Sequence, residues 1–185
     1  MENDKVAAFI SEAGALKHTK RTGWRLLGIK DQESVAEHSF RASIIAFLLA
    51  KMEGADAEHA CALAAFHDMS ETRLGDLDKV QQSYVDAKSA EKVVAKEQSN
   101  ALGDGGWYLS MQEEIFSCSS KEAIIAKDAD LLELAFTAIE YIEQGYPAQE
   151  WLENAGKGLK TASAKGVLSN VKSGGIPWWS GLKKL

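Results

Sequence analysis

The sequence predicts an all-α protein that folds as one compact domain, a bundle of about six to eight helices. Apolar residues recur at helical spacing nearly everywhere, and no segment shows the strict alternation of a half-buried strand. There are only two prolines, Pro147 and Pro177, so long helices can run without interruption through most of the chain. With 185 residues, of which 45% are hydrophobic, one domain can bury a sizeable core.

Two helices are expected in the first third of the chain. The first covers residues 4–16, where apolar residues recur on one face. Residues 18–32 contain two glycines and a basic cluster, so a loop is expected there. The second helix is expected to begin at Ser34, because Ser34 and Glu37 have the spacing of a capping box, and to end at Gly54.

The later helices are predicted by caps and by glycine or proline breaks. Asp56 can cap a third helix that ends near residue 68, and short turns are expected after it. A polar helix over 88–102 stops at a Gly-rich break. A long helix over 121–144 precedes Pro147, which can start a further short helix.

No repeat, low-complexity tract or linker divides the sequence, so residues 1–185 are expected to form a single domain. Its core is expected within about 16–145, and a C-terminal helical extension and a Trp-containing tail follow. Trp178 and Trp179 in that tail are expected to pack back on the body, although paired aromatic residues could also anchor a dimer contact.

The composition predicts a soluble cytoplasmic protein. Its net charge of −6 argues against a nucleic-acid polymer as partner, but it permits a small phosphorylated substrate. The first residues lack the basic start and apolar run of a signal peptide, and no stretch is apolar enough to span a membrane. Cys61 and Cys118 are isolated and form no disulfide framework, which agrees with a reducing compartment.

His67 and Asp68 place an imidazole beside a carboxylate where a helix is expected to end. Adjacent side chains diverge by about 100° on a continuous helix, but at its terminus both could face one ion. His38 lies in an apolar helix, where a polar side chain needs a partner, and Glu37 could orient it instead of capping the helix. Completed by a carboxylate from a distant helix, this set suits one divalent cation such as Mn²⁺, Co²⁺, Fe²⁺, Mg²⁺ or Zn²⁺.

Four segments appear in the order RTGW, ESVAEHSFRAS, AAFHDMSETRLGDL and AKDADLLELA. Together they resemble the HD-domain hydrolases, and within these most closely the 5′-deoxynucleotidase group. The resemblance runs from about residue 16 to residue 141 and is most specific at His67-Asp68-x-x-Glu71 and the following Gly75-Asp76. It implies an HD-type helical bundle that removes the 5′-phosphate from deoxynucleoside monophosphates, and a dimer in many members.

The family pattern, carried over residue by residue, implies four metal ligands: His38, His67, Asp68 and Asp130. It further implies that Glu71 positions or deprotonates the attacking water, and that Asp76 lies close to the substrate sugar or water network. A bound divalent cation would neutralise phosphoryl oxygens and lower the pKa of water toward about 7. Glu71 follows Asp68 by three residues, so one helical turn can bring it to the same side as a base.

The fourth ligand has a rival. On a helical wheel Asp128 lies within the apolar stripe of its helix and Asp130 lies on another face. The pattern alone therefore favours Asp128 as the buried residue, whereas the resemblance favours Asp130. Glu133, one turn further on, could support Asp130 or pair with an arginine.

The substrate loop is expected between Arg21 and Arg25. An ungapped match leaves Gly23 opposite the arginine of part of the family, so Arg21 or Arg25 would have to contact the phosphate. Trp24 could stack on the sugar or base through its aromatic face, or it could anchor the loop in the core.

The resemblance, together with these residues, favours a 5′-nucleotidase that releases phosphate from (deoxy)nucleoside 5′-monophosphates, and the resemblance implies a homodimer. One alternative is an HD hydrolase of another small phosphate ester, such as a nucleoside triphosphate, cyclic nucleotide or sugar phosphate. The other is a non-enzymatic, metal-stabilised module that binds nucleotides, and it would leave Glu71 and Asp76 without a role.

Overall fold

The computed structural model describes residues 1–174, and over this range the chain is all-helical, as the sequence predicts. Those residues form ten α-helices and two 3-10 helices, more than the about six to eight helices expected. Two of the additional helices are single turns in a segment where turns were predicted, α4 (Glu71–Leu74) and α5 (Lys79–Gln82). The helix α7 (Gly106–Ser117) follows the Gly-rich break.

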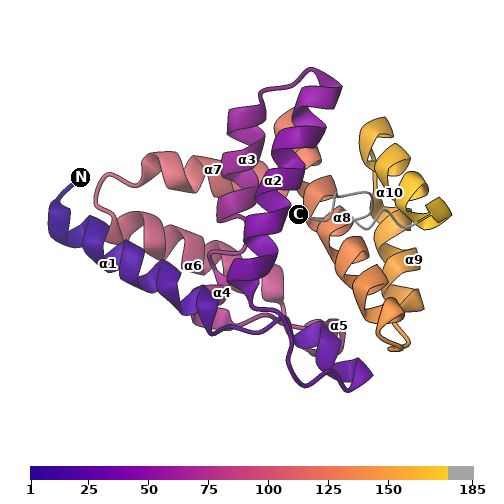
Figure 1. Ribbon diagram of the computed structural model, residues 1–185. Helices are drawn as coiled ribbons and strands as arrows, with labels where there is room; N and C mark the ends of the chain where they lie inside the picture. The colour runs from indigo at the N-terminus through magenta and orange to yellow at the C-terminus, as the bar shows by residue number, and fades with distance from the viewer. Residues whose placement is uncertain (175–185) are drawn as a thin grey trace, which may run out of the picture.

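Three helices form the centre of the molecule: α2 (Val35–Glu53), α3 (Ala57–Phe66) and α8 (Lys121–Glu143) (Figure 1). Their contacts depend on small residues, because fully buried alanines on all three helices let the backbones approach closely. These include Ala46, Ala60 and Ala129.

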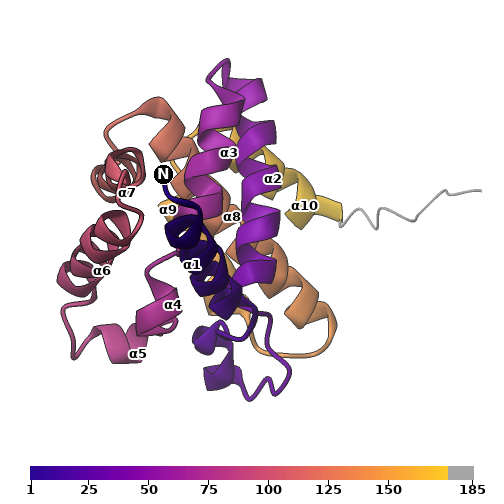
Figure 2. The same ribbon diagram turned by 90° about the vertical axis from the view of Figure 1, so that its left-hand side faces the viewer.

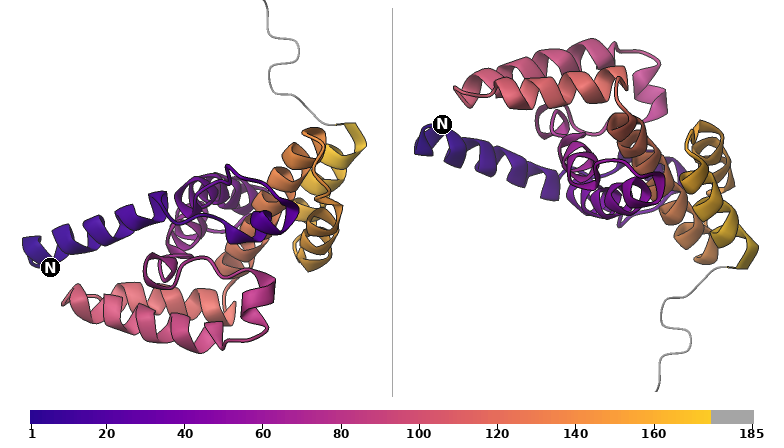
Figure 3. Two further views of the ribbon diagram at one scale, coloured as in Figure 1. Left: turned by 90° about the horizontal axis from the view of Figure 1, so that it is seen from below. Right: turned by 90° about the horizontal axis from the view of Figure 1, so that it is seen from above.

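The remaining helices cover two sides of this centre. Figure 3 shows α6 (Ala87–Ala101) and α7 on one side, and α9 (Gln149–Gly158) and α10 (Ala162–Gly174) on the other. In Figure 2 the short helices α4 and α5 lead from the centre to α6 along one edge of the molecule. Helix α8 has buried residues on several of its faces, and these helices cover it from both sides.

The predicted caps are present at the ends of α2 and α3. Ser34 and Glu37 form both hydrogen bonds of a capping box, so Glu37 caps the helix and does not orient His38. Gly54 ends α2 in the left-handed conformation with φ of 64°. Asp56 accepts hydrogen bonds from the first backbone N–H groups of α3.

The segment between the first two long helices is more ordered than expected. The helix α1 (Asn3–Ala13) continues as the 3-10 helix η1 (Gly14–Lys17). A second 3-10 helix, η2 (Thr22–Leu27), lies within the predicted loop and carries Trp24 into the core. A buried aromatic side chain therefore fixes this segment where glycines alone predict a loop.

Two expectations concern the chain as a whole. Among the helices within 1–174, none combines the length and the apolar character needed to cross a membrane. Trp178 and Trp179, with the expected packing of the tail, lie outside the described residues.

Candidate metal centre

Three elements bring the four expected ligands to one place. His38 lies in the first turns of α2 and is completely buried. The helix α3 ends at Phe66, so His67 and Asp68 follow at its C-terminus, where the chain turns toward α4. Asp130 comes from the middle of α8, which packs against both α2 and α3.

The donor atoms of these residues lie within a few ångströms of one another. His38 Nε2 is 3.3 Å from His67 Nε2, 3.3 Å from Asp130 Oδ1 and 3.7 Å from Asp68 Oδ2. His67 Nε2 is 3.1 Å from Asp68 Oδ2 and 3.9 Å from Asp130 Oδ1. Ligands held at about 2.0–2.2 Å from one cation are spaced in this way.

The donor set also fits a cation chemically. Asp68 Oδ2 is buried and has no hydrogen-bond partner within the described part of the chain. An orphaned carboxylate oxygen is costly in a protein interior unless it binds a cation or a proton. Two imidazoles and two carboxylates are a ligand set that several divalent metals accept.

The other nitrogen of each histidine is fixed by a hydrogen bond. His67 Nδ1 donates to the backbone carbonyl of Ala64 at 2.6 Å, so Nε2 faces the cluster. His38 Nδ1 donates to the carboxylate of Glu133, which is only 1% exposed. Outer hydrogen bonds of this kind hold a metal-binding imidazole in one tautomer and orientation.

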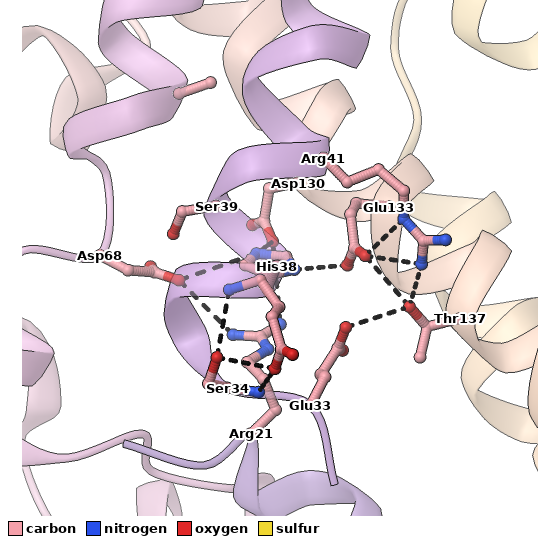
Figure 4. A network of polar contacts seen from close by, with 12 residues as sticks. Arg21, Glu33, Ser34, His38, Ser39, Arg41, Asp68, Asp130, Glu133 and Thr137 are labelled. Carbon is pink, nitrogen blue, oxygen red and sulfur yellow. Dashed lines mark hydrogen bonds and ion pairs between the residues drawn. The ribbon is translucent and has the colours of Figure 1, made fainter. Parts of the chain in front are cut away.

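A second group of buried polar residues holds Glu133 in place (Figure 4). Arg41 Nε donates to Glu133 Oε1 at 2.9 Å, and the Thr137 hydroxyl donates to the same oxygen at 3.1 Å. Arg41 continues to Glu140 at the surface. The sequence suggested that Glu133 could support Asp130 or pair with an arginine, and the structure shows the arginine pair together with the contact to His38.

Two positively charged side chains, Arg21 and Lys127, lie beside the carboxylates of the cluster. Arg21 Nη1 lies 3.6 Å from Asp68 Oδ2 and 3.4 Å from Asp76 Oδ1, as Figure 4 shows in part. Lys127 Nζ lies 2.6 Å from Asp130 Oδ2. Burial alone would raise the pKa of Asp68, but His67 and Arg21 outweigh it and hold that pKa below its ordinary value. Asp68 therefore remains a carboxylate suited to a cation.

The pKa of His38 is also set by burial acting against neighbouring charges. Burial and Arg21 lower the pKa of the imidazole, but the hydrogen bonds to Asp130 and Glu133 outweigh them and raise it to about 9. Without a cation, His38 thus retains a proton that a metal would have to displace.

Glu71 points into the same site from the first residue of α4. Its Oε2 atom is buried and has no hydrogen-bond partner among residues 1–174. Burial and then the neighbouring carboxylates of Asp68 and Asp76 raise the pKa of Glu71 to about 10. A carboxyl group in this setting is strongly basic when ionised, and a nearby divalent cation would favour its ionised form.

Asp76 is engaged in fixing the loop that carries Arg21. Its carboxylate accepts hydrogen bonds from the backbone N–H and the hydroxyl of Thr22, and it pairs with Arg21. Asp76 also borders the cavity at the cluster, and its place near the substrate stays a prediction.

The structure does not bring the other two loop residues to the cluster. Trp24 is 1% exposed, its indole N–H donates to Glu33 Oε1 at 3.0 Å, and its ring packs on Tyr141. The expectation that Trp24 stacks on substrate is therefore corrected in favour of the alternative, a core anchor. Arg25 donates to Asp78 Oδ2 at 2.8 Å through Nε, so only Arg21 of the two arginines reaches the cluster.

Asp128 has a separate structural task. Its carboxylate is buried and accepts hydrogen bonds from the backbone N–H groups of Lys160 and Thr161 and from the Thr161 hydroxyl. These contacts fasten the segment between α9 and α10 to α8. Of the two rival aspartates, Asp130 is thus the one beside the histidines.

The cluster opens into a cavity of about 650 Å³. Arg21, His67, Asp68, Glu71, Asp76 and Asp130 border it. Residues that the sequence did not single out also line it, including Lys127 and Trp151. Lys127 lies three residues before Asp130, and this helical spacing is the sequence feature that could have predicted an ion pair between the two.

Comparisons with known proteins agree on one family. A profile of the HD domain matches residues 13–170. The 5′-deoxynucleotidase HDDC2 of Danio rerio is 32% identical over 150 residues, which cover 79% of this chain and 74% of that protein. The 5′-deoxynucleotidase hdd1 of Schizosaccharomyces pombe is 27% identical over 189 residues, covering 97% and 94%. A solved structure, a conserved hypothetical protein from Pyrococcus furiosus, superposes with a TM-score of 0.78 at 30% identity, over 90% of this chain and 99% of that one.

Proposed function

This chain belongs to the HD-domain family of metal-dependent phosphohydrolases, and we propose that it is a 5′-nucleotidase that releases phosphate from (deoxy)nucleoside 5′-monophosphates. The observation that carries the proposal is the convergence of two histidines and two aspartates beside Glu71, whose buried Oε2 atom has no hydrogen-bond partner within residues 1–174. The relatives named as 5′-deoxynucleotidases support the substrate class.

Four side chains would hold the divalent cation: His38, His67, Asp68 and Asp130. When bound there, the cation supplies positive charge for the phosphoryl oxygens and makes water more acidic. The same ligand types accept Mn²⁺, Co²⁺, Fe²⁺, Mg²⁺ or Zn²⁺, so the proposal includes one divalent metal and leaves its identity to experiment.

The protein's own groups would carry the remaining steps. Glu71 accepts the proton of the attacking water at its free Oε2 atom. Arg21, which pairs with Asp76, offers its guanidinium to the phosphoryl oxygens. Lys127 adds a second positive charge at the edge of the same site.

The proposal is tested by phosphate release from purified protein. Deoxy- and ribonucleoside 5′-monophosphates, 3′-monophosphates and triphosphates are compared with Mn²⁺, Co²⁺ or Mg²⁺, and with chelator. We expect chelator-sensitive turnover of 5′-monophosphates and a loss of about 10²-fold or more in Glu71→Gln, in line with the contribution of a general base. Absence of turnover of every monophosphate by metal-loaded protein would refute the nucleotidase.

The proposal extends to the assembly and the compartment. Helix α2 carries a row of exposed apolar side chains, namely Phe40, Ile44, Phe47, Leu48 and Met52. A row of this kind favours a second copy of the chain as partner, hence a homodimer. Cys61 and Cys118 are both free, which supports a reducing compartment such as the cytoplasm.

A further inference from the structure

The cavity beside the candidate metal centre has an apolar wall that the proposed chemistry does not use. Three half-buried side chains of α8 and α9 contribute to its lining: Leu131, Leu134 and Trp151. None of them carries charge, whereas the rest of the lining includes the ligands, Arg21 and several lysines. A cavity of about 650 Å³ is also larger than a phosphate group requires and lies in the range of cavities that enclose small organic ligands.

This wall lies beside the expected ligands on α8. Leu134 follows Asp130 by four residues on α8, so it projects from the same face about 6 Å further along the helix axis. Gly158 on α9 approaches Leu131 closely, because a Cβ atom at Gly158 would lie only 2.7 Å from Leu131 Cδ1. Leu131 directly follows Asp130 and packs against α9 at Gly158, so the wall adjoins the cation ligands and extends about one helical turn beyond them to Leu134.

Trp151 is held in a defined position at this wall. Its ring stacks on Trp24, with centroids 6.1 Å apart and an interplanar angle of 26°. Trp24 is itself 1% exposed and hydrogen-bonded to Glu33, so it supports Trp151 from the core. A supported indole loses little conformational freedom on binding a flat ring.

We propose that the wall of Trp151, Leu131 and Leu134 is the binding site for the nucleobase of the substrate. The inference rests on the proposed function, since it assigns the phosphate end of a nucleotide to the cation ligands and Arg21. A neutral aromatic heterocycle matches an uncharged wall that contains an indole, and stacking on an aromatic side chain contributes to binding of any base. Trp151 thus takes the substrate-stacking role that the sequence suggested for Trp24.

The test compares two substrates that have the same phosphate ester, with and without a base. They are a deoxynucleoside 5′-monophosphate and 2-deoxyribose 5-phosphate, each hydrolysed by the metal-loaded enzyme. We expect the wild type to prefer the nucleotide in kcat/KM by about tenfold or more. Trp151→Leu should lower kcat/KM for the nucleotide about tenfold, mainly by raising KM, and should leave the base-free substrate within about twofold. Trp151→Phe, which keeps an aromatic ring, should retain most of the preference.

Trp107→Leu is the matched control, because Trp107 is a 41% exposed tryptophan on α7 that does not line the cavity. It should leave the rates with both substrates unchanged. If the wild type hydrolyses both substrates equally well, or if Trp151→Leu lowers both rates alike, the base site is wrong while the nucleotidase stands. If neither substrate nor any other nucleoside monophosphate is hydrolysed, the proposed function itself fails. If Trp151→Leu does not fold, the wild-type comparison still tests the proposal, because equal rates with both substrates would overturn it.

Discussion

At the scale of single residues, the two nitrogens of His38 have different partners. Nε2 faces the other expected ligands, and Nδ1 donates to Glu133, whose second oxygen accepts hydrogen bonds from Arg41 and Thr137. Glu133 thus sets the orientation of the His38 imidazole. Because His38 and Glu133 are both buried, a replacement of Glu133 should change the affinity for the cation.

We expect Glu133→Gln to weaken binding of a divalent cation by about 10- to 100-fold. The amide is isosteric but uncharged, so its hydrogen bond with the imidazole N–H is weaker. Nε2 then becomes a weaker electron-pair donor to the cation. Titration of the apoprotein with Mn²⁺ or Zn²⁺ against a chelator of known affinity measures the change. Glu140→Gln is the matched control, because Glu140 also pairs with Arg41 but is exposed and is not among the contacts of His38. Equal affinities of wild type and Glu133→Gln would show that the contact has no influence on the metal.

Part of this site was predictable from the sequence. The resemblance to the HD-domain hydrolases implied His38, His67, Asp68 and Asp130 as ligands, and the structure brings these four side chains together. His67, Asp68 and Glu71 are close in the sequence, whereas His38 and Asp130 reach them through the packing of α2, α3 and α8. Trp24 and Arg25 were expected at the substrate, yet one is in the core and the other pairs with Asp78. An aromatic or positively charged side chain can contact a substrate or stabilise the fold, and the sequence does not distinguish these two roles. The packing of η2 does.

At the scale of elements, two aspartates separated by one residue on α8 have different tasks. Asp128 accepts hydrogen bonds from three donor groups of Lys160 and Thr161, whereas Asp130 faces His38 and Lys127. The helical wheel correctly indicated that Asp128 is buried. It could not show that α10 is fastened there, since that contact joins residues 32 and 33 positions apart.

Replacing Asp128 should therefore affect stability, and replacing Asp130 should affect metal binding. Asp128→Ala removes a buried carboxylate that accepts hydrogen bonds from the N–H groups of Lys160 and Thr161, so we expect a loss on the order of 3 kcal/mol in the free energy of unfolding. Urea denaturation of the metal-free protein measures this loss. Asp130→Asn, the matched variant, should lower metal affinity at least tenfold. The assignment would be reversed if Asp128→Ala abolished metal binding in a protein that remained folded.

Helices with a clear cap were predictable as elements, and single-turn helices were not. Ser34, Asp56 and Ser120 each accept a hydrogen bond from the first turn of a long helix, and the sequence places those helices within a few residues. The helices α4 and α5 have four residues each, too few for a periodic pattern. Their position depends on long-range contacts such as those of Arg73 with Glu12.

At the scale of the whole molecule, α2 joins the candidate metal centre to a surface. Its inward face carries His38 and buried alanines, and its outward face carries the apolar row from Phe40 to Met52. The row follows helical spacing over about 18 Å of helix axis, and Phe40 is 71% and Leu48 56% exposed. A surface helix of a monomer is ordinarily polar on this side, so a stripe of this length favours packing against a second copy about a two-fold axis.

We expect the wild-type protein to be a dimer in solution and the double variant Phe40→Glu, Leu48→Glu to be a monomer. Two carboxylates from each chain would have to be desolvated in such an interface, which costs more than the apolar contacts of a small interface supply. Light scattering coupled to size exclusion measures the mass at micromolar concentration. Val93→Glu is the control, because Val93 is a 58% exposed apolar residue on α6, away from this row, and its replacement should leave the dimer intact. A monomeric wild type, or a double variant that still doubles its mass, would place the interface elsewhere or exclude it. His38 is on the same helix as the apolar row. If the double variant is monomeric, its metal affinity shows whether the dimer also stabilises the position of His38 in the candidate metal centre.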